Sequence, residues 1–196
     1  MFILFLIIGL AGGYALGSVP FGLVLTKMAG IDDIRKTGSG NIGATNVLRT
    51  GRKDLALLTL ISDSGKGALA VFLLGLLSPW AAIGAALGSV LGHLYPYWLE
   101  FKGGKGVATT LGVLIILTPV AGILACAIWL VTAFLFRMSS LSALIAMAIT
   151  PLFAGAIYGD VYALVTLLIA ALVWYKHKEN IKRITSGTES KIGDKS

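Results

Sequence analysis

The sequence is poor in charged residues, which occupy 13% of its 196 positions, whereas 57% of the positions are hydrophobic. Soluble globular domains carry about 25% charged residues. This shortage of charge, together with a mean hydropathy of +0.89, excludes an ordinary soluble domain. No linker or strand pattern separates the apolar runs. We therefore expect an all-α polytopic membrane protein with a single integral-membrane domain over residues 1–196.

Cysteine is almost absent, and clusters of metal-ligating or nucleophilic residues are absent as well. The one cysteine, Cys126, lies inside an apolar segment, so the chain has no disulfide framework. No carboxylate pair stands near the polar loops to hold Mg²⁺, because Asp32 and Asp33 are better interpreted as solvated loop charges. No Ser–His–Asp or Cys–His arrangement can be assembled. We expect no metal, no cofactor and no covalent enzyme intermediate.

Acidic residues are also few, with nine Asp and Glu against sixteen Lys and Arg, for a net charge of +7. Six of the basic residues lie between 27 and 53, and six more lie between 176 and 195. The chain has neither aromatic-rich basic segments nor a helix-turn-helix signal, so this charge does not indicate a nucleic-acid partner. Its placement between apolar segments is instead typical of membrane topology.

The apolar residues form seven segments that are candidates for transmembrane helices. They cover residues 2–25, 54–77, 79–96, 106–117, 119–136, 141–158 and 161–175. The first segment has no preceding basic residues and is longer than the apolar core of a signal peptide, so we expect a first spanning helix. Residues 107–136 as one helix would be about 45 Å long, beyond the ~30 Å hydrocarbon core. We therefore predict a turn at Thr118-Pro119 and two short helices, the fourth and fifth.

Charge placement gives the expected orientation. With seven spans, every basic cluster follows an odd-numbered helix and lies on one side, which the positive-inside rule makes cytoplasmic. The N-terminus is then outside, and the C-terminus, with a polar tail over 185–196, is inside. Glycine at every fourth position, as in Gly9-Gly13-Gly17 and Gly84-Gly88-Gly92, predicts close helix packing.

The most distinctive polar stretch runs from Lys36 to Arg49. It contains G-S-G-N-I-G, which matches the dinucleotide pattern G-x-G-x-x-G. No strand precedes it and no βαβ unit can form here, so we reject a dinucleotide site. Glycines, hydroxyls and amides with a nearby guanidinium still suit a phosphate. The alternative is a flexible loop with solvated cytoplasmic charge.

Three further polar stretches lie on the same predicted side. Asp63 and Lys66, at i and i+3 of the second segment, should share a face and pair, either bracing the loop or contacting substrate. A glycine turn with Lys105 runs into a helix and forms an anion site that is not a Walker A loop. His93 is best interpreted as structural. The last stretch combines the serines after Arg137 with residues 177–189.

Taken together, these motifs resemble the acyl-phosphate-dependent glycerol-3-phosphate 1-acyltransferases of bacterial phospholipid synthesis. The matching pieces span nearly the whole chain in the family's order: G-S-V-P-F (17–21), G-S-G-N-I-G-A-T-N-V-L-R (38–49), D-S-G-K-G (63–67), G-H-L-Y-P (92–96), F-K-G-G-K-G-V-A-T (101–109), S-L-S-A (140–143) and H-K-E-N-I-K-R-I-T-S-G-T-E (177–189). The one minor departure is Tyr95, where the family often has Phe or another large residue.

The resemblance implies transfer of a fatty acyl group from acyl phosphate to the 1-hydroxyl of sn-glycerol 3-phosphate, giving lysophosphatidic acid and inorganic phosphate. This is the first step of phospholipid synthesis at the bacterial cytoplasmic (inner) membrane, and an upstream acyl-phosphate-forming enzyme is an implied partner. The H-x-x-x-x-D signature of thioester-dependent acyltransferases is absent, because Trp98 follows His93 and Lys182 follows His177 at that spacing.

Site residues follow from the resemblance and from the residue types. The expected catalytic set is Arg49, Lys105, Ser142, His177 and Asn180, which would hold glycerol 3-phosphate. The expected substrate-binding set is Ser18, Gly38, Ser39, Gly40, Asn41, Gly43, Thr45, Asn46, Gly103, Gly104, Gly106, Thr109 and Ser140. Asp63, Lys66, His93 and Glu189 form a last group whose role, structural or in contact with substrate, is left open. The assignment of loops to phosphates could be swapped.

Two questions of mechanism and class stay open at this point. The proton of the attacking hydroxyl could pass to the acyl phosphate's own oxygens, with His177 orienting the hydroxyl, or to His177 itself. The rival class is a small-anion transporter or anion-binding membrane protein. Transporter sites lie near the bilayer midplane between repeats, whereas the polar motifs here lie on one predicted side. An odd number of helices also leaves no two equal halves.

Overall fold

The computed structural model describes residues 1–194, and these residues form helices and connecting loops with no β-strand. The α-helices are α1 (Phe2–Gly17), α2 (Phe21–Met28), α3 (Ala44–Arg49), α4 (Lys53–Gly75), α5 (Pro79–Leu94), α6 (Val107–Leu117), α7 (Pro119–Phe136), α8 (Ser139–Tyr158), α9 (Asp160–Lys176) and α10 (Lys178–Thr185). Two 3₁₀ turns, η1 (Ile34–Lys36) and η2 (Tyr97–Leu99), lie in the longer loops. The all-α prediction is confirmed.

The first apolar segment is broken, which corrects the expected single helix over residues 2–25. α1 ends at Gly17 and α2 begins at Phe21. Pro20 between them has no N–H and disfavours helical backbone in the residue before it. The carbonyl of Val19, released from the helical ladder, accepts a hydrogen bond from Nζ of Lys66 at 2.7 Å. A partly buried backbone carbonyl is thereby satisfied from a neighbouring helix.

The predicted turn at Thr118-Pro119 is confirmed, because α6 ends at Leu117 and α7 begins at Pro119. Proline is favoured at the first position of a helix, where its missing N–H costs no hydrogen bond. The expectation that both flanking helices are short holds for one of them. α6 has 11 residues, whereas α7 has 18 and is long enough to cross a bilayer.

The helices have the length and apolar character of a multi-pass membrane protein. By length and composition, four segments could cross a membrane: Phe2–Met28, Lys53–Gly75, Pro119–Phe136 and Ser139–Tyr158. The count is five if α9 and α10, bent by 64°, form one span. Large apolar side chains face outward, such as Phe134 with 85% of its surface exposed. Such faces suit lipid and not water.

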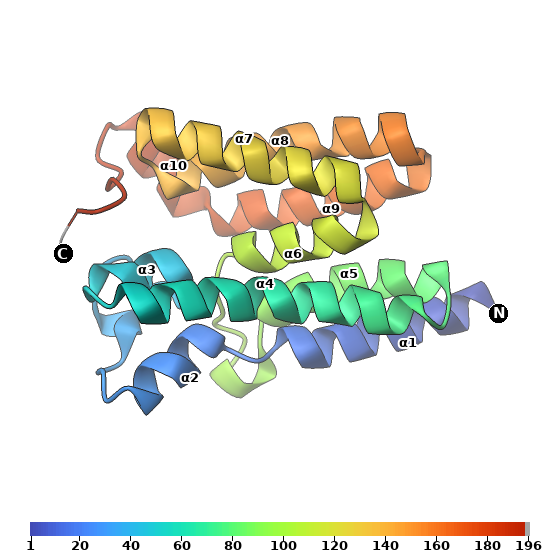
Figure 1. Cartoon of the computed structure of the whole chain (residues 1–196), viewed down its shortest axis with the longest axis horizontal. Coiled ribbons are helices and arrows are strands. Elements are labelled where there is room, and N and C mark those ends of the chain that lie inside the picture. The colour runs from blue at the N-terminus through green and yellow to red at the C-terminus, as the bar shows by residue number, and fades with distance from the viewer. Residues whose placement is uncertain (195–196) are drawn as a thin grey trace.

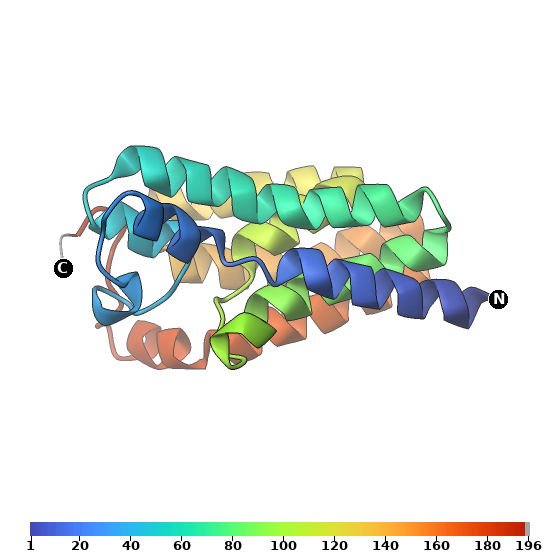
Figure 2. The ribbon, with the colours of Figure 1, turned by 90° about the horizontal axis from the view of Figure 1, so that it is seen from below.

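Two groups of helices lie side by side. Figure 1 shows α1, α4 and α5 on one side of α6, and α7, α8 and α9 on the other. The α1–α5 contact is close because glycine leaves room: a Cβ atom at Gly13 would lie 2.5 Å from the carbonyl oxygen of Ala85. The predicted glycine-mediated packing is therefore present. Figures 1 and 2 place the N-terminus at one end of the bundle and α2, α3, α10 and the C-terminal segment at the other.

Candidate active site

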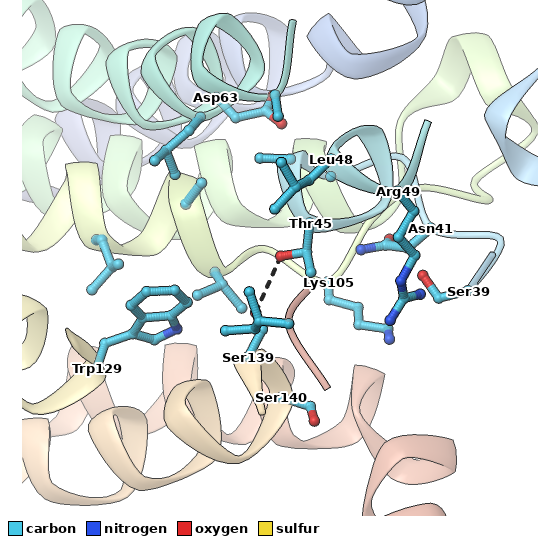
Figure 3. A pocket seen from close by; sticks show the side chains of 18 of the residues that line it. Ser39, Asn41, Thr45, Leu48, Arg49, Asp63, Lys105, Trp129, Ser139 and Ser140 are labelled. Atoms are coloured by element: carbon cyan, nitrogen blue, oxygen red, sulfur yellow. Dashed lines mark hydrogen bonds between the residues drawn. The ribbon is translucent and has the colours of Figure 1, made fainter. Parts of the chain in front are cut away.

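A cavity of about 490 Å³ lies between the two helix groups, near the end that carries α3 and α10. Its polar part, here called the polar limb, is lined by Ser39, Asn41, Gly43, Thr45, Arg49, Lys105, Ser139, Ser140, His177, Asn180, Glu189 and Ser190. Its apolar part, the apolar limb, is lined by Leu48, Ala56, Leu57, Leu60, Val107, Leu111, Cys126, Trp129 and Leu130. Figure 3 shows Lys105, Arg49 and Ser140 apart from Trp129, with Thr45 and Ser139 between.

The first glycine loop, residues 38–43, is built around the side chain of Asn46. Its amide nitrogen donates to the carbonyls of Ile34 at 2.8 Å and Thr37 at 3.2 Å. Its Oδ1 accepts from the backbone N–H of Ser39 at 2.9 Å. Asn46 is 1% exposed, so its side chain holds the loop from inside and does not face the cavity. Gly38 and Gly40 have φ angles of 56° and 67° and make the turns.

The second glycine loop, residues 103–106, has a different construction. The N–H groups of Gly103 and Gly104 donate to the carbonyls of Leu94 at 3.2 Å and His93 at 3.0 Å. Gly104 also packs directly under the His93 ring, which leaves no space for a Cβ atom. Two of the predicted backbone donors are therefore used within the protein. Gly106 lines the cavity with Lys105.

Lys105 heads a chain of hydrogen bonds across the polar limb. Its Nζ lies 2.6 Å from Oδ1 of Asn180, and Nδ2 of Asn180 donates to Oε1 of Glu189 at 2.7 Å. Glu189 also accepts from Oγ of Ser140 and Nε of Arg183, each at 2.7 Å. The carboxylate fixes which way the Asn180 amide points, since only its NH₂ group can donate to Glu189. The amide oxygen is thereby aimed at Lys105.

The surroundings shift the pKa values of three ionisable groups in this limb. Desolvation lowers the pKa of Lys105 to about 8. Burial also lowers the pKa of His177 to about 4, and its Nδ1 is 2.7 Å from the carbonyl of Val173. Nδ1 must carry the proton of that bond, which leaves Nε2 as an acceptor. Burial would raise the pKa of Glu189, but hydrogen bonds from Ser140, Asn180 and Arg183 outweigh it and lower that pKa overall.

The predicted Asp63–Lys66 pair is present and includes His93. Nζ of Lys66 lies 2.7 Å from Oδ1 of Asp63 and 3.0 Å from Nδ1 of His93. All three side chains are buried. Lys66 also satisfies the Val19 carbonyl, and the His93 carbonyl holds the second glycine loop. This geometry favours the bracing interpretation over a direct substrate contact, although Asp63 and His93 do border the cavity.

Eight predicted site residues lie outside the lining of the cavity: Gly38, Gly40, Asn46, Gly103 and Gly104, in or beside the two loops described above, and Ser18, Thr109 and Ser142 elsewhere. The hydroxyl of Ser18 donates to the Tyr14 carbonyl at 2.7 Å, and the hydroxyl of Ser142 donates to the Met138 carbonyl at 2.9 Å. Thr109 is fully buried on α6, where Gly67 packs against it. Each side chain faces protein and not the cavity described above. The structure therefore does not bring these residues to the polar limb with the others.

The expected site sets left out several cavity residues, among them Ser139, which belongs to the polar stretch after Arg137 but had no assigned role. Ser139 lies 3.2 Å from Oγ1 of Thr45, which joins α8 to α3 across the cavity (Figure 3). The larger omission is the C-terminal segment, expected as a polar tail. Instead, residues 189–192 line the cavity, and the guanidinium of Arg49 donates to the hydroxyl of Ser190. Only the family motif, which ends at Glu189, hinted that this stretch belongs to the site.

Fold and cavity together define a class: a multi-pass membrane protein with a cationic polar limb beside an apolar limb. Within this class, a family model described as "Glycerol-3-phosphate acyltransferase" matches residues 7–187. The chain belongs to that family.

Named relatives agree over almost the full length. The glycerol-3-phosphate acyltransferase of Nitrobacter winogradskyi is 54% identical over 190 residues, covering 96% of this chain and 97% of that protein. The corresponding protein of Methylorubrum extorquens is 55% identical over 190 residues, with 97% and 94% covered. Crystal structures of PlsY (YgiH), an integral membrane glycerol 3-phosphate acyltransferase, are also similar. Its glycerol 3-phosphate form matches with a TM-score of 0.86 at 37% identity, covering 96% of each chain.

Proposed function

We propose that this protein transfers a fatty acyl group from acyl phosphate to the 1-hydroxyl of sn-glycerol 3-phosphate, giving lysophosphatidic acid and inorganic phosphate. The observation that carries the proposal is one cavity with a cationic polar limb and an apolar limb. A soluble dianion and an amphiphile with a phosphate head suit these two environments. Membership of the glycerol-3-phosphate acyltransferase family supports the acceptor.

The apolar limb suits the acyl chain of the donor. Its walls are α4 and α7, and short α6 contributes Val107 and Leu111 between them. Leu57 and Leu130, on the two walls, are 57% and 61% exposed on the side that would meet lipid. A chain lying there would stay in apolar surroundings during the reaction, so the donor need not leave the bilayer.

The polar limb suits two phosphate groups. Arg49 and Lys105 are the cations for glycerol 3-phosphate, with Asn180 and His177 beside them. The first glycine loop, through Ser39, Asn41, Gly43 and Thr45, is the wall for the acyl phosphate. Ser142 and Asn46 contribute indirectly, because their side chains hold the start of α8 and the loop itself.

The reaction needs no covalent enzyme intermediate. The 1-hydroxyl oxygen attacks the acyl carbon, the bond from that carbon to the phosphate oxygen breaks, and the hydroxyl proton passes to the departing phosphate. Because the pKa of His177 is lowered to about 4, this residue is a weak base, and we assign it the orientation of the hydroxyl through Nε2. Charge stabilisation and positioning then supply the catalysis.

We further propose seven spans in a bacterial inner membrane, with the N-terminus outside and the active site and C-terminus in the cytoplasm. This topology is supported by the end of the bundle at which α2, α3, α10 and the C-terminal segment gather (Figures 1 and 2), where most of the Lys and Arg residues lie. An enzyme that forms acyl phosphate would supply the donor from the same leaflet.

A reconstitution assay tests the function and its rival together. Purified protein in liposomes receives labelled glycerol 3-phosphate with palmitoyl phosphate, with palmitoyl-CoA, or with no donor. We expect lipid-soluble product with palmitoyl phosphate alone. Product with palmitoyl-CoA but not with palmitoyl phosphate would disprove acyl phosphate as the donor. Label trapped in the aqueous lumen without a donor would indicate a transporter.

A further inference from the structure

The C-terminal segment Thr188–Ile192, here called the strap, is bounded by two glycines in left-handed conformations. Gly187 has a φ of 72° and Gly193 a φ of 93°. Such values favour glycine and allow the chain to change direction sharply. Figure 1 shows the segment beyond α10 running along the end of the bundle, from the level of α7 and α8 toward α3. Figure 2 also places this end of the chain near α3.

Arg137 clamps the far end of the strap at two points. The backbone N–H of Ile192 donates to the Arg137 carbonyl at 2.6 Å, and the Arg137 guanidinium donates back to the Ile192 carbonyl at 3.1 Å. Arg137 ends α7 with a φ of 56°, a left-handed conformation that is uncommon for a residue other than glycine. The backbone carbonyl and the side chain of Arg137 therefore both fix the strap to the end of α7.

Two contacts connect the strap to Lys105 and Arg49, the cations proposed to bind glycerol 3-phosphate. The Glu189 carboxylate, with its side chain only 6% exposed, orients Asn180 and through it Lys105. The next residue, Ser190, accepts from the guanidinium of Arg49. The strap thus bridges α3 on one side of the cavity and α8 and α10 on the other.

Water is a competitor for the acyl group in any such site. Attack of a water oxygen on the acyl carbon breaks the same bond to phosphate and releases a fatty acid and inorganic phosphate, with the proton passing to that phosphate. Residues 189–192 line the cavity, and they lie at the end of the bundle where α2, α3, α10 and the C-terminal segment gather (Figures 1 and 2), which is the proposed cytoplasmic end. A wall in this position lowers the amount of water around the reacting carbon.

We propose that the strap, clamped by Arg137, is the cover that makes the site choose glycerol 3-phosphate over water as the acyl acceptor. Among the described residues that line the cavity, Arg137 is absent, so it acts through the strap and is a positioning residue. The inference rests on the proposed acyl-phosphate reaction. The new element is that the share of consumed acyl phosphate that ends as lysophosphatidic acid depends on Arg137, a residue outside the cavity.

The test compares product ratios in three full-length variants. Arg137→Ala removes the guanidinium contact, Arg137→Lys keeps a cation there, and Arg52→Ala removes an exposed arginine of the same end that pairs with Asp54. Each is assayed with palmitoyl phosphate and glycerol 3-phosphate, and inorganic phosphate and lysophosphatidic acid are both measured. For Arg137→Ala we expect the phosphate-to-product ratio and the KM for glycerol 3-phosphate to rise about tenfold, as for one lost charge-assisted hydrogen bond.

The other variants make this outcome specific. Arg137→Lys should recover part of the coupling, and Arg52→Ala should keep the wild-type ratio. A one-to-one ratio and an unchanged KM in Arg137→Ala would overturn the proposal. If wild-type protein makes no product from palmitoyl phosphate, the proposed function has failed, which is a different result.

A measurement independent of activity covers a variant that loses turnover altogether. Amide hydrogen exchange of residues 188–193 is followed in detergent-solubilised protein, with α8 as the internal reference. We expect Arg137→Ala to speed exchange in the strap and leave α8 unchanged, and we expect glycerol 3-phosphate to slow strap exchange in the wild type. Equal exchange in variant and wild type, or faster exchange everywhere, counts against the strap.

Discussion

The two glycine loops of the site use glycine in different ways. In the first loop, Gly38 and Gly40 adopt left-handed backbone that turns the chain around the buried Asn46 amide. In the second, Gly106 is left-handed as well, but Gly104 provides space, so that the chain can pass under the His93 ring. Glycine content alone therefore does not identify the loop whose N–H groups face a ligand. The first loop is organised from within, and the second is held by its neighbours α4 and α5.

The largest expected effect comes from adding one methyl group to the second loop. Gly104→Ala forces a Cβ atom into the buried His93 ring, and overpacking of this kind costs about 1–3 kcal/mol. We expect a lower thermal midpoint in detergent and acyltransferase activity at background. Gly65→Ala is the matched control, because a Cβ there meets nothing within 4 Å, and alanine is the better helix former. If Gly65→Ala were also inactive, the loss of activity in Gly104→Ala could not be assigned to the contact with the His93 ring.

Next in size is loss of the cation beside the second loop. Lys105→Met keeps the length of the side chain but loses the ammonium group that faces Asn180. We expect kcat/KM for glycerol 3-phosphate to fall about 100-fold, because a charge-assisted hydrogen bond is worth up to about 3 kcal/mol. The KM for acyl phosphate should change little. Steady-state kinetics with each substrate varied in turn checks this, and a selective rise in the acyl-phosphate KM would swap the two phosphates between the loops.

A smaller effect is expected from the centre of the first loop. Asn46→Asp removes the NH₂ group that donates to the carbonyls of Ile34 and Thr37 and leaves both acceptors beside a carboxyl. The loop should loosen, and the KM for acyl phosphate should rise about tenfold, as for one unsatisfied buried hydrogen bond. The KM for glycerol 3-phosphate serves as the internal control. Equal rises in both constants would mean that the first loop serves both phosphates.

The smallest effect is a titration. The pKa of Lys105 is lowered by burial to about 8, so its charge is complete well below that pH and is lost as the pH rises through it. We expect kcat/KM for glycerol 3-phosphate to fall to about half its plateau near pH 8. Lys105→Arg should abolish this decline in the pH profile, since guanidinium stays charged. His177, with a pKa near 4, should cause no change of rate with pH near neutrality. A pH dependence near neutrality that vanished in His177→Ala would identify His177 as the general base.

Much of the fold was predictable from the sequence because a bilayer imposes strong constraints. Helix length is limited by membrane thickness, so Thr118-Pro119 had to be a turn, and it is. A buried charge needs a partner, so Asp63 had to pair with Lys66, and it does. Both conclusions depend on local sequence and on general costs that apply to any membrane helix.

The rest depended on long-range contacts that leave no local pattern. Residues 188–192 are polar and short, which predicts a solvated tail, yet Glu189 is buried by partners up to 49 positions away. Ser18 and Ser142 were expected at the site because of their motifs, but both hydroxyls bond to the carbonyl one turn before them. Whether a hydroxyl faces a cavity or its own helix depends on rotation about the helix axis, which the motif does not encode.

The short length of α6 sets the depth at which the chemistry takes place. α6 ends at the turn where α7 begins, and the two helices extend from it toward the same end of the bundle (Figure 1). α6 has seven residues fewer, 11 against 18, which amounts to about 10 Å at 1.5 Å per residue. The positive end of α6, with Lys105 next to it, therefore stops well below the level that α7 reaches. In the proposed reaction, the soluble dianion glycerol 3-phosphate descends into the bundle to meet its partner, whereas the amphiphilic acyl phosphate already lies at that depth. One truncated helix brings an aqueous and a lipid reactant to the same level.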